Sequence, residues 1–163
     1  MFKKFVFLML VLGFFSLTSS AFAQGVEIIS KAEVDIKVKK ADGTFETKRV
    51  PASQANVGPG DVVIFSNICV NKGEKPAEDI VITNPIPNHT VYVDGSAEGK
   101  DTIIEFSVDG GKTFGNPEKL IVFGEDGRPR KAKAEDYTHI RWKVTKPIPT
   151  AQSVVVSFRA KIK

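Results

Sequence analysis

The residues of this 163-residue chain that could do chemistry are few and far apart in the sequence. Its two histidines, His89 and His139, are separated by fifty positions, and its one cysteine, Cys69, has no partner for an intramolecular disulfide, a thiolate zinc site or a redox pair. We expect the histidines on the surface or in turns, and Cys69 as a small apolar residue of a strand. Cross-linking of two copies through Cys69 is a less favoured alternative. No nucleophile, base and metal ligand converge, so no catalytic residue and no cofactor are predicted.

Acidic residues in predicted turns are the candidates for a calcium site, because Ca²⁺ takes about six to eight oxygen ligands. No D-x-D-x-D-G spacing occurs, and Lys100, Lys112 and Arg128 stand among the acids. Ordinary solvated turn residues are therefore the favoured interpretation, and no metal site is predicted. The acidic residues concerned are Asp94, Asp101, Asp109, Glu125 and Asp126.

One motif has specific turn chemistry. The segment SVDGGKTF (residues 107–114) matches S-x-D-x-G-x-T-F, which looks like the Asp-box of sialidase-like propellers. An aspartate can accept hydrogen bonds from turn N–H groups, and glycines supply positive φ, so the motif favours a stapled hairpin. A sialidase would need several such boxes and a much longer chain. The predicted structural turn motif consists of Ser107, Asp109, Gly111, Thr113 and Phe114.

The first 23 residues are predicted to be a cleavable signal peptide. Lys3 and Lys4 form a positive region, residues 5–15 are apolar apart from Gly13, and AFA at residues 21–23 is a small-residue cleavage site. No other segment approaches ~18 consecutive apolar residues, so no transmembrane segment is expected after removal of the leader. We therefore expect an exported protein, located in the periplasm, outside the cell or on its surface.

The composition of residues 24–163 indicates an all-β protein. These residues contain 17 Val and 14 Ile but a single Leu, Leu120. Branched side chains lose rotamer freedom in helices and pack well on pleated sheets. The length supports one domain with one core, residues 24–163. The net charge without the leader is +2, which is too small to predict nucleic-acid binding.

The pattern of apolar residues predicts about eight or nine strands separated by turn signals, which is typical of an antiparallel sandwich or barrel. Residues 32–38 alternate strictly, and we expect one face of that strand in a core. Residues 61–70 are apolar enough for a central strand covered on both faces, whereas residues 129–137 are predicted as a loop. Trp142, Ile140 and Phe158 are the predicted core residues. The expected strands are residues 32–38, 44–50, 61–70, 77–83, 90–93, 102–108, 120–123, 138–144 and 154–162.

The chain from Val57 onward resembles the domain-of-unknown-function family numbered eleven, a repeat module of bacterial and archaeal surface proteins. The matching pieces are residues 57–97, FSVDGGKTF at residues 106–114 and residues 137–162. The resemblance implies an immunoglobulin-like antiparallel β-sandwich without catalytic residues, usually found in tandem copies. Here it occurs once. Residues 24–56 would form an N-terminal strand or hairpin extension, and residues 57–163 the family-like core.

These features favour an exported, non-catalytic structural or interaction module of the cell envelope, whose partners are other envelope proteins or copies of itself. One alternative is a self-assembling extracellular fibre subunit, in which the regularly alternating N-terminal segment, residues 26–40, would pair with a neighbouring copy through Val34, Ile36 and Val38. Pairing of this strand within its own sheet is the slightly favoured interpretation. Another alternative is a carbohydrate-binding module, which would require exposed Tyr92, Tyr137 and Trp142. The basic segment RPRKAK (residues 128–133) is interpreted as a solvated loop, with a weak contact to an anionic surface as the sharper alternative.

Overall fold

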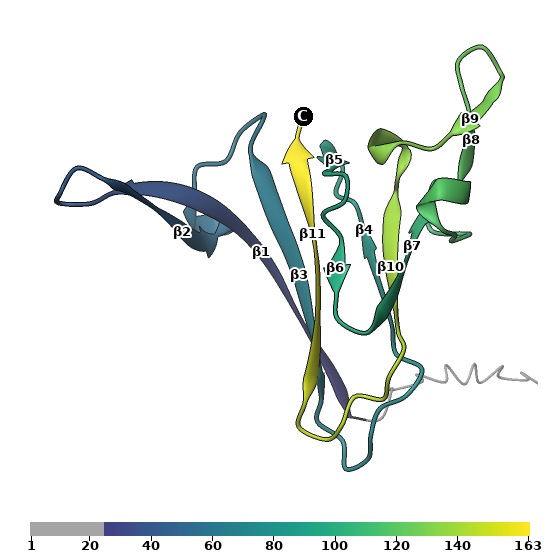
Figure 1. The fold of residues 1–163 in the computed structure, drawn as a ribbon, viewed down its shortest axis with the longest axis horizontal. Helices are drawn as coiled ribbons and strands as arrows, with labels where there is room; N and C mark the ends of the chain where they lie inside the picture. The colour runs from purple at the N-terminus through teal and green to yellow at the C-terminus, as the bar shows by residue number, and fades with distance from the viewer. Residues whose placement is uncertain (1–24) are drawn as a thin grey trace, which may run out of the picture.

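The computed structural model describes residues 25–163, and the predicted signal peptide lies outside this part of the chain. Residues 25–163 form an all-β structure, in which two antiparallel sheets face each other (Figure 1). The larger sheet contains β1 (Val26–Lys39), β2 (Phe45–Pro51), β3 (Val62–Asn71), β5 (Thr90–Tyr92), β6 (Glu98–Gly99) and β11 (Ser153–Ile162). The smaller sheet contains β4 (Val81–Pro85), β7 (Thr102–Ser107) and β10 (His139–Val144). A separate ribbon pairs β8 (Ile121–Phe123) with β9 (Pro129–Lys131).

The strand order places β3 and β11 at the centre of the larger sheet. Its order is β2-β1-β3-β11-β5, with β6 also paired to β11, and the order of the smaller sheet is β4-β10-β7. Three short 3₁₀ helices, η1 (Ala52–Gln54), η2 (Pro117–Lys119) and η3 (Ala134–Asp136), lie in the connections. No helix among residues 25–163 is long and apolar enough to cross a membrane.

The predicted all-β, antiparallel architecture is confirmed, and each of the nine expected strands has a counterpart. Two short strands, β6 and β9, were not expected, and η3 lies in the segment expected to be a loop. β1 begins at Val26, the first residue of the alternating segment named in the fibre hypothesis and six residues before the strictly alternating run, and β4 begins at Val81 rather than residue 77. The late start of β4 follows from Asp79, whose φ of 54° interrupts extended backbone.

The core lies where β10 of the smaller sheet faces β3 and β11. Trp142 and Ile140 are fully buried on one side, and Phe158 is 1 % exposed on the other. The Phe158 ring stacks on Phe65 with 5.2 Å between centroids and lies 6.2 Å from the Trp142 ring. Such aromatic contacts add to the free energy gained by burial. The three residues expected in the core therefore lie in its most buried part.

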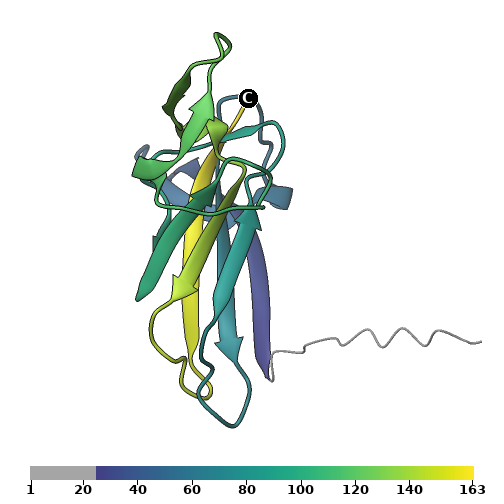
Figure 2. The same ribbon diagram turned by 90° about the vertical axis from the view of Figure 1, so that its right-hand side faces the viewer.

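The smaller sheet does not extend over β1. Its three strands cover β3 and β11, whereas Ile28, on the inner face of β1, is 52 % exposed. Figure 2 shows the first half of β1 (purple) at an edge of the molecule, beyond the strands of the smaller sheet. The expectation that residues 32–38 have one face in a core is therefore wrong except at Val34, which is 5 % exposed. The alternation sets the face of a side chain, but only a second layer buries it.

The outer face of β3 also differs from expectation. We expected both faces of this strand to be covered, but no other sheet of residues 25–163 packs on its outer side. Val62 is exposed there, and Ile68 and Val70 are half-buried. Only Ile64 is buried on that face. The dense apolar run reflects the central position of β3 within its sheet rather than burial between two layers.

Candidate functional site

The first half of β1 has an open edge, which we define as residues 26–32. β3 pairs with β1 over Val26 to Val34, whereas β2 pairs with it only from Glu33 to Lys39. The Gly25 carbonyl accepts a hydrogen bond from the Lys72 N–H, so the odd-numbered residues of β1 direct their backbone groups toward β3. The even-numbered residues direct theirs away. In residues 25–163 no strand pairs with this other side of residues 26–32. The residues concerned are Val26, Ile28, Ser30 and Ala32.

The side chains of the open edge include two exposed charges, Glu27 and Lys31, but no stronger device against pairing with another strand. Glu27, Ile29 and Lys31 lie on the outer face, and Ile29 is 41 % exposed. Proteins usually protect such edges with proline, bulges or inward-pointing charges. The free edge of β4 has one such device, because Pro85, its last residue, lacks an N–H. Residues 26–32 contain no proline and no inward-pointing charge.

The second half of β1 continues past β3 and pairs only with β2. These residues form the N-terminal ribbon (residues 35–49), which projects away from the two sheets (Figure 1). Of the three residues expected in a donor strand, Val34 is buried at the root of the ribbon, Ile36 is exposed and Val38 is half-buried. All three pair with β2 of their own chain. The ribbon also exposes Phe45 at 65 %.

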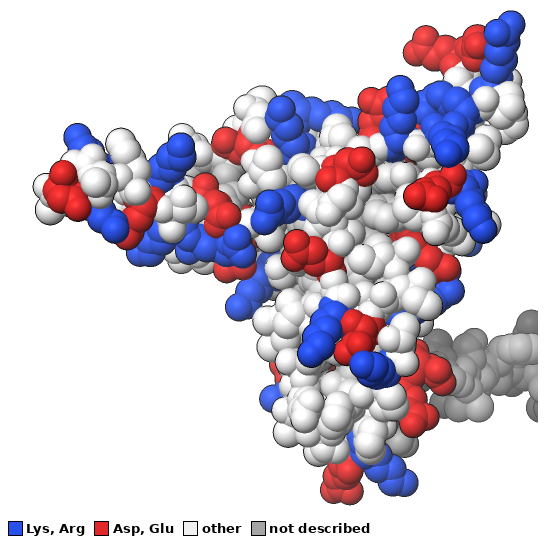
Figure 3. Space-filling model, viewed as in Figure 1, with Lys and Arg blue, Asp and Glu red and all other residues white. Residues whose placement is uncertain are grey.

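The ribbon carries charges of both signs, as its surface shows (Figure 3). Arg49 donates two hydrogen bonds to Asp35, at 2.8 and 3.0 Å. These bonds hold the pKa of Asp35 below its ordinary value and raise that of Arg49. At the root of the ribbon a hollow of about 460 Å³ separates residues 34–37 from residues 54–57, Asp61 and Val62. Within residues 25–163, no strand pairs with residues 35–37 of β1 on the side opposite β2.

The five residues of the predicted turn motif meet in one loop after β7. The Asp109 carboxylate accepts hydrogen bonds from the Thr113 hydroxyl, from the backbone N–H groups of Lys112 and Thr113, and from the Ser107 hydroxyl. These bonds, led by those from Thr113, hold the pKa of Asp109 far below its usual range. The Ser107 oxygen accepts from the Gly111 N–H, and Gly111 has a φ of 82°.

The aromatic residue of the motif contacts an ion-pair cluster on the outer face of the smaller sheet. The Arg141 guanidinium lies 4.1 Å from the centre of the Phe114 ring, a cation–π distance. Arg141 also donates to Glu105, as does Lys143. Burial of Glu105 opposes its ionisation, but these hydrogen bonds outweigh that effect and lower its pKa. The cations are therefore already paired, and the cluster presents no unpaired charge to a ligand.

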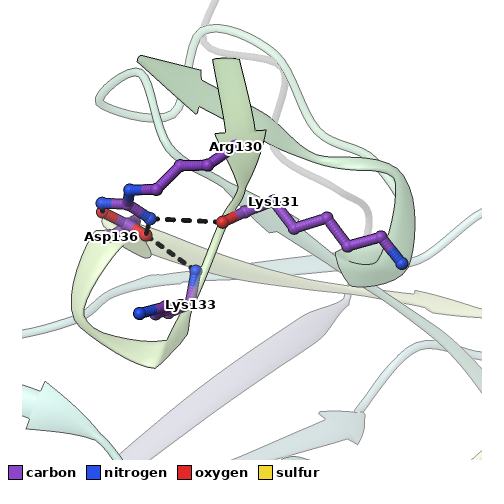
Figure 4. A network of polar contacts seen from close by, with 4 residues as sticks. All are labelled: Arg130, Lys131, Lys133 and Asp136. Carbon is purple, nitrogen blue, oxygen red and sulfur yellow. Dashed lines mark hydrogen bonds and ion pairs between the residues drawn. The ribbon is translucent and has the colours of Figure 1, made fainter. Parts of the chain in front are cut away.

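The basic segment is also partly compensated (Figure 4). Arg130 makes two hydrogen bonds to Asp136, at 2.7 and 2.8 Å, and the Lys133 N–H donates to the same carboxylate. The bonds from Arg130 lower the pKa of Asp136. Arg128 lies 3.8 Å from Asp126. Two of the four basic side chains thus have acidic partners, which weakens the attraction to an anionic surface.

The structure brings the two histidines closer than their spacing suggested. His89 and His139 line one hollow of about 340 Å³, together with Glu135 and Lys163. No local pattern indicates this proximity, because the β4–β5 connection and β10 are far apart along the chain. In the part of the chain that the structure describes, no group of three or more His, Cys, Asp or Glu side chains is arranged to hold a metal ion.

Cys69 and the aromatic residues named for sugar binding all lie inside the molecule. Cys69 is fully buried, which raises the pKa of its thiol and leaves it no surface for cross-linking. Tyr92, Tyr137 and Trp142 are all less than a tenth exposed. Burial raises the pKa of both tyrosines. Among residues 25–163, no group accepts a hydrogen bond from the buried Trp142 Nε1–H.

The open edge lies in the first part of the alternating segment, residues 26–40, that the fibre hypothesis names, whereas the donor residues expected there, Val34, Ile36 and Val38, lie beyond it. Val26 and Ile28 continue the same alternation and are the signal that could have located the edge. Comparison with known proteins found no matching family model, no similar curated protein and no similar solved structure.

Proposed function

We propose that this protein is an exported, non-catalytic structural or interaction module of the cell envelope, built as an immunoglobulin-like β-sandwich. It binds other envelope proteins or its own copies by strand pairing. The observation that carries this proposal is the open edge of β1, where four residues direct backbone N–H and C=O groups to a side on which no strand of residues 25–163 pairs, without proline or inward-pointing charge. The predicted signal peptide and the resemblance of residues 57–163 to a surface-protein module support the location.

The chemistry of the remaining surface agrees with a binding role. The charged clusters around Glu105 and Asp136 are internally paired, and the Asp109 carboxylate is engaged by its own turn. Such groups stabilise turns and sheets but have little capacity left for acid–base work. Backbone pairing needs no such groups, since it uses main-chain hydrogen bonds for affinity and alternate side chains for specificity.

Cell fractionation and immunogold microscopy test the proposal with the full chain. We expect a processed protein that begins at Gln24, found in the periplasm or on the surface and cross-linked there into complexes by a short amine-reactive reagent. A matched chain with Ala21 and Ala23 both changed to Leu should remain unprocessed. Unprocessed wild-type protein in the cytoplasm would contradict the proposal. So would a hydrolytic or redox activity that a point mutation abolishes.

The projecting ribbon favours one second candidate, a self-assembling fibre subunit. An isolated two-stranded hairpin is only marginally stable in water, so the ribbon would gain from a neighbour. Replacing residues 37–47 by Asn-Gly joins Ile36 to Lys48 through a two-residue turn and leaves β3 untouched. If the ribbon builds fibres, this variant stays folded but no longer polymerises in electron micrographs. Equal polymerisation of both forms, or none by the full chain, argues against the fibre.

A further inference from the structure

We propose that the partner of the open edge is a second copy of this chain. Two copies would pair antiparallel through residues 26–32, related by a twofold axis at Ile29, so that their larger sheets become one continuous sheet. This inference rests on the proposed function, because it names the occupant of the same edge.

The backbone restricts how two such edges can pair. Only the even-numbered residues of β1 direct N–H and C=O groups outward, so even-numbered residues of one copy must face even-numbered residues of the other. An axis at Ile29 satisfies this rule. It places Val26 opposite Ala32 and Ile28 opposite Ser30, each pair occurring twice. β2 ends at Pro51, opposite Glu33, and the chain turns there into η1, which also contacts β1, so the strand of the second copy must begin beside this turn.

The side chains select this register among the allowed ones. With the axis at Ile29, Glu27 faces Lys31 of the second copy, and the symmetry creates the same pair again. The two exposed Ile29 side chains face each other. Moving the axis to Ser30 sets Glu27 opposite Glu33, and moving it to Ile28 sets Glu27 opposite Ile29. Opposite charges facing across strands are favourable and like charges are not.

The inner face also gains from this pairing. Ile28 points to the inner side of the larger sheet, where the smaller sheet does not cover it. In the proposed register the two Ile28 side chains are diagonal neighbours, within reach of each other. The contact is isologous, so it closes as a dimer and does not propagate into a filament.

A cysteine at the axis tests the register. Residues facing across a non-hydrogen-bonded antiparallel pair have Cα atoms about 4.5 Å apart, within disulfide range. We expect Ile29→Cys to form a disulfide-linked dimer under mild oxidation. Ile103→Cys, at a similarly exposed position on the outer face of the smaller sheet, should not. No dimer from Ile29→Cys, or equal dimer from both variants, contradicts the register.

A proline pair tests the edge itself. Ile28→Pro removes an N–H that points outward, so the monomer should keep its thermal stability while the dimer Kd rises at least about tenfold by sedimentation equilibrium. Ile29→Pro removes a bond to β3 and should lower the thermal stability, which shows that the two sides of β1 differ. An unchanged Kd for a folded Ile28→Pro chain contradicts the proposal.

Charge reversal tests whether the partner is a second copy of this chain. That question is separate from whether the open edge binds any partner at all. Glu27→Lys should raise the dimer Kd roughly tenfold, and the double change with Lys31→Glu should restore it. The exposed Glu27–Lys72 contact at 3.9 Å contributes little to this difference. If the wild type is monomeric at its highest soluble concentration but Ile28→Pro still loses its envelope complexes, self-pairing is wrong and the proposed function stands. If the envelope complexes also survive in the Ile28→Pro variant, both self-pairing and the proposed function are wrong.

Discussion

β1 and β11 are both long strands of the larger sheet with regular alternation, yet they have opposite surroundings. On β11, Val156 and Phe158 are almost completely buried, whereas Ile28 and Ile36 on the same side of β1 are exposed. The difference does not arise from the side chains, which are similarly apolar. It arises because the smaller sheet has only three strands and lies over β3 and β11. The covered part holds the structure together, and the uncovered part leaves apolar side chains exposed.

The largest expected effect contrasts the two strands directly. Phe158→Ala removes the ring that contacts both Phe65 and Trp142, and should lower the free energy of unfolding by about 3–5 kcal/mol. Ile36→Ala, in the ribbon, should cost less than about 1 kcal/mol, since no core surrounds it. Urea denaturation monitored by circular dichroism measures both. Equal losses of unfolding free energy would mean that Ile36 is packed as tightly as Phe158.

A smaller effect is expected at the base of the covered region. Asn71 is fully buried, and its amide donates to the carbonyls of Lys75 and Ile148 and accepts from the Gly73 N–H. Asn71→Ala leaves these groups unpaired and should cost about 3 kcal/mol. The exposed cap Asn116, which accepts from the Glu118 N–H, is the control, with a cost of about 1 kcal/mol. If Asn71→Ala lowers the free energy of unfolding no more than Asn116→Ala does, the three buried hydrogen bonds of Asn71 do not contribute as proposed.

The Asp109 turn gives a pH-dependent test on an exposed loop. The folded state lowers the pKa of Asp109, so its contribution to stability is complete above about pH 4 and is lost as the pH falls toward the folded pKa. Relative to wild type, Asp109→Asn should be less stable near pH 7, and the difference should shrink in acid. Thermal melts from pH 7 to pH 2 measure it. A difference that does not change with pH would assign the loss to packing rather than to the carboxylate.

The smallest effect is expected on the open face of the ribbon. Ile36→Thr keeps a branched residue suited to a strand, and should change the free energy of unfolding by no more than about 0.5 kcal/mol. The same change at Val156 exchanges a methyl group for a hydroxyl in the core, and should cost well over 1 kcal/mol. Paired urea titrations of the two variants compare them, and similar costs would remove the distinction between covered and uncovered strands.

Sequence pattern predicted the strands well because alternation and turn residues are local signals. It missed β9, whose residues Pro129 to Lys131 are mostly charged. It also missed β6, whose Gly99 adds no side chain to the pattern; Gly99 pairs with Val156, and it is a glycine because a Cβ there would lie 3.0 Å from the Trp142 ring. The open edge could not be predicted, since it depends on how far β2 pairs along β1, and the exposed inner face of β1 depends on where the smaller sheet ends. Only the assembled sheets determine that.

The burial of Trp142 has a practical consequence for spectroscopy. It is the only tryptophan of the chain, it is fully buried, and its Nε1–H has no hydrogen-bond partner within the described part of the chain, residues 25–163. Its emission maximum should therefore lie at short wavelength in the native protein and shift to longer wavelength when water reaches the indole. Because the ring lies on β10 near Phe158 of β11, this single fluorophore reports separation of the two sheets and should be silent to events at the distant ribbon.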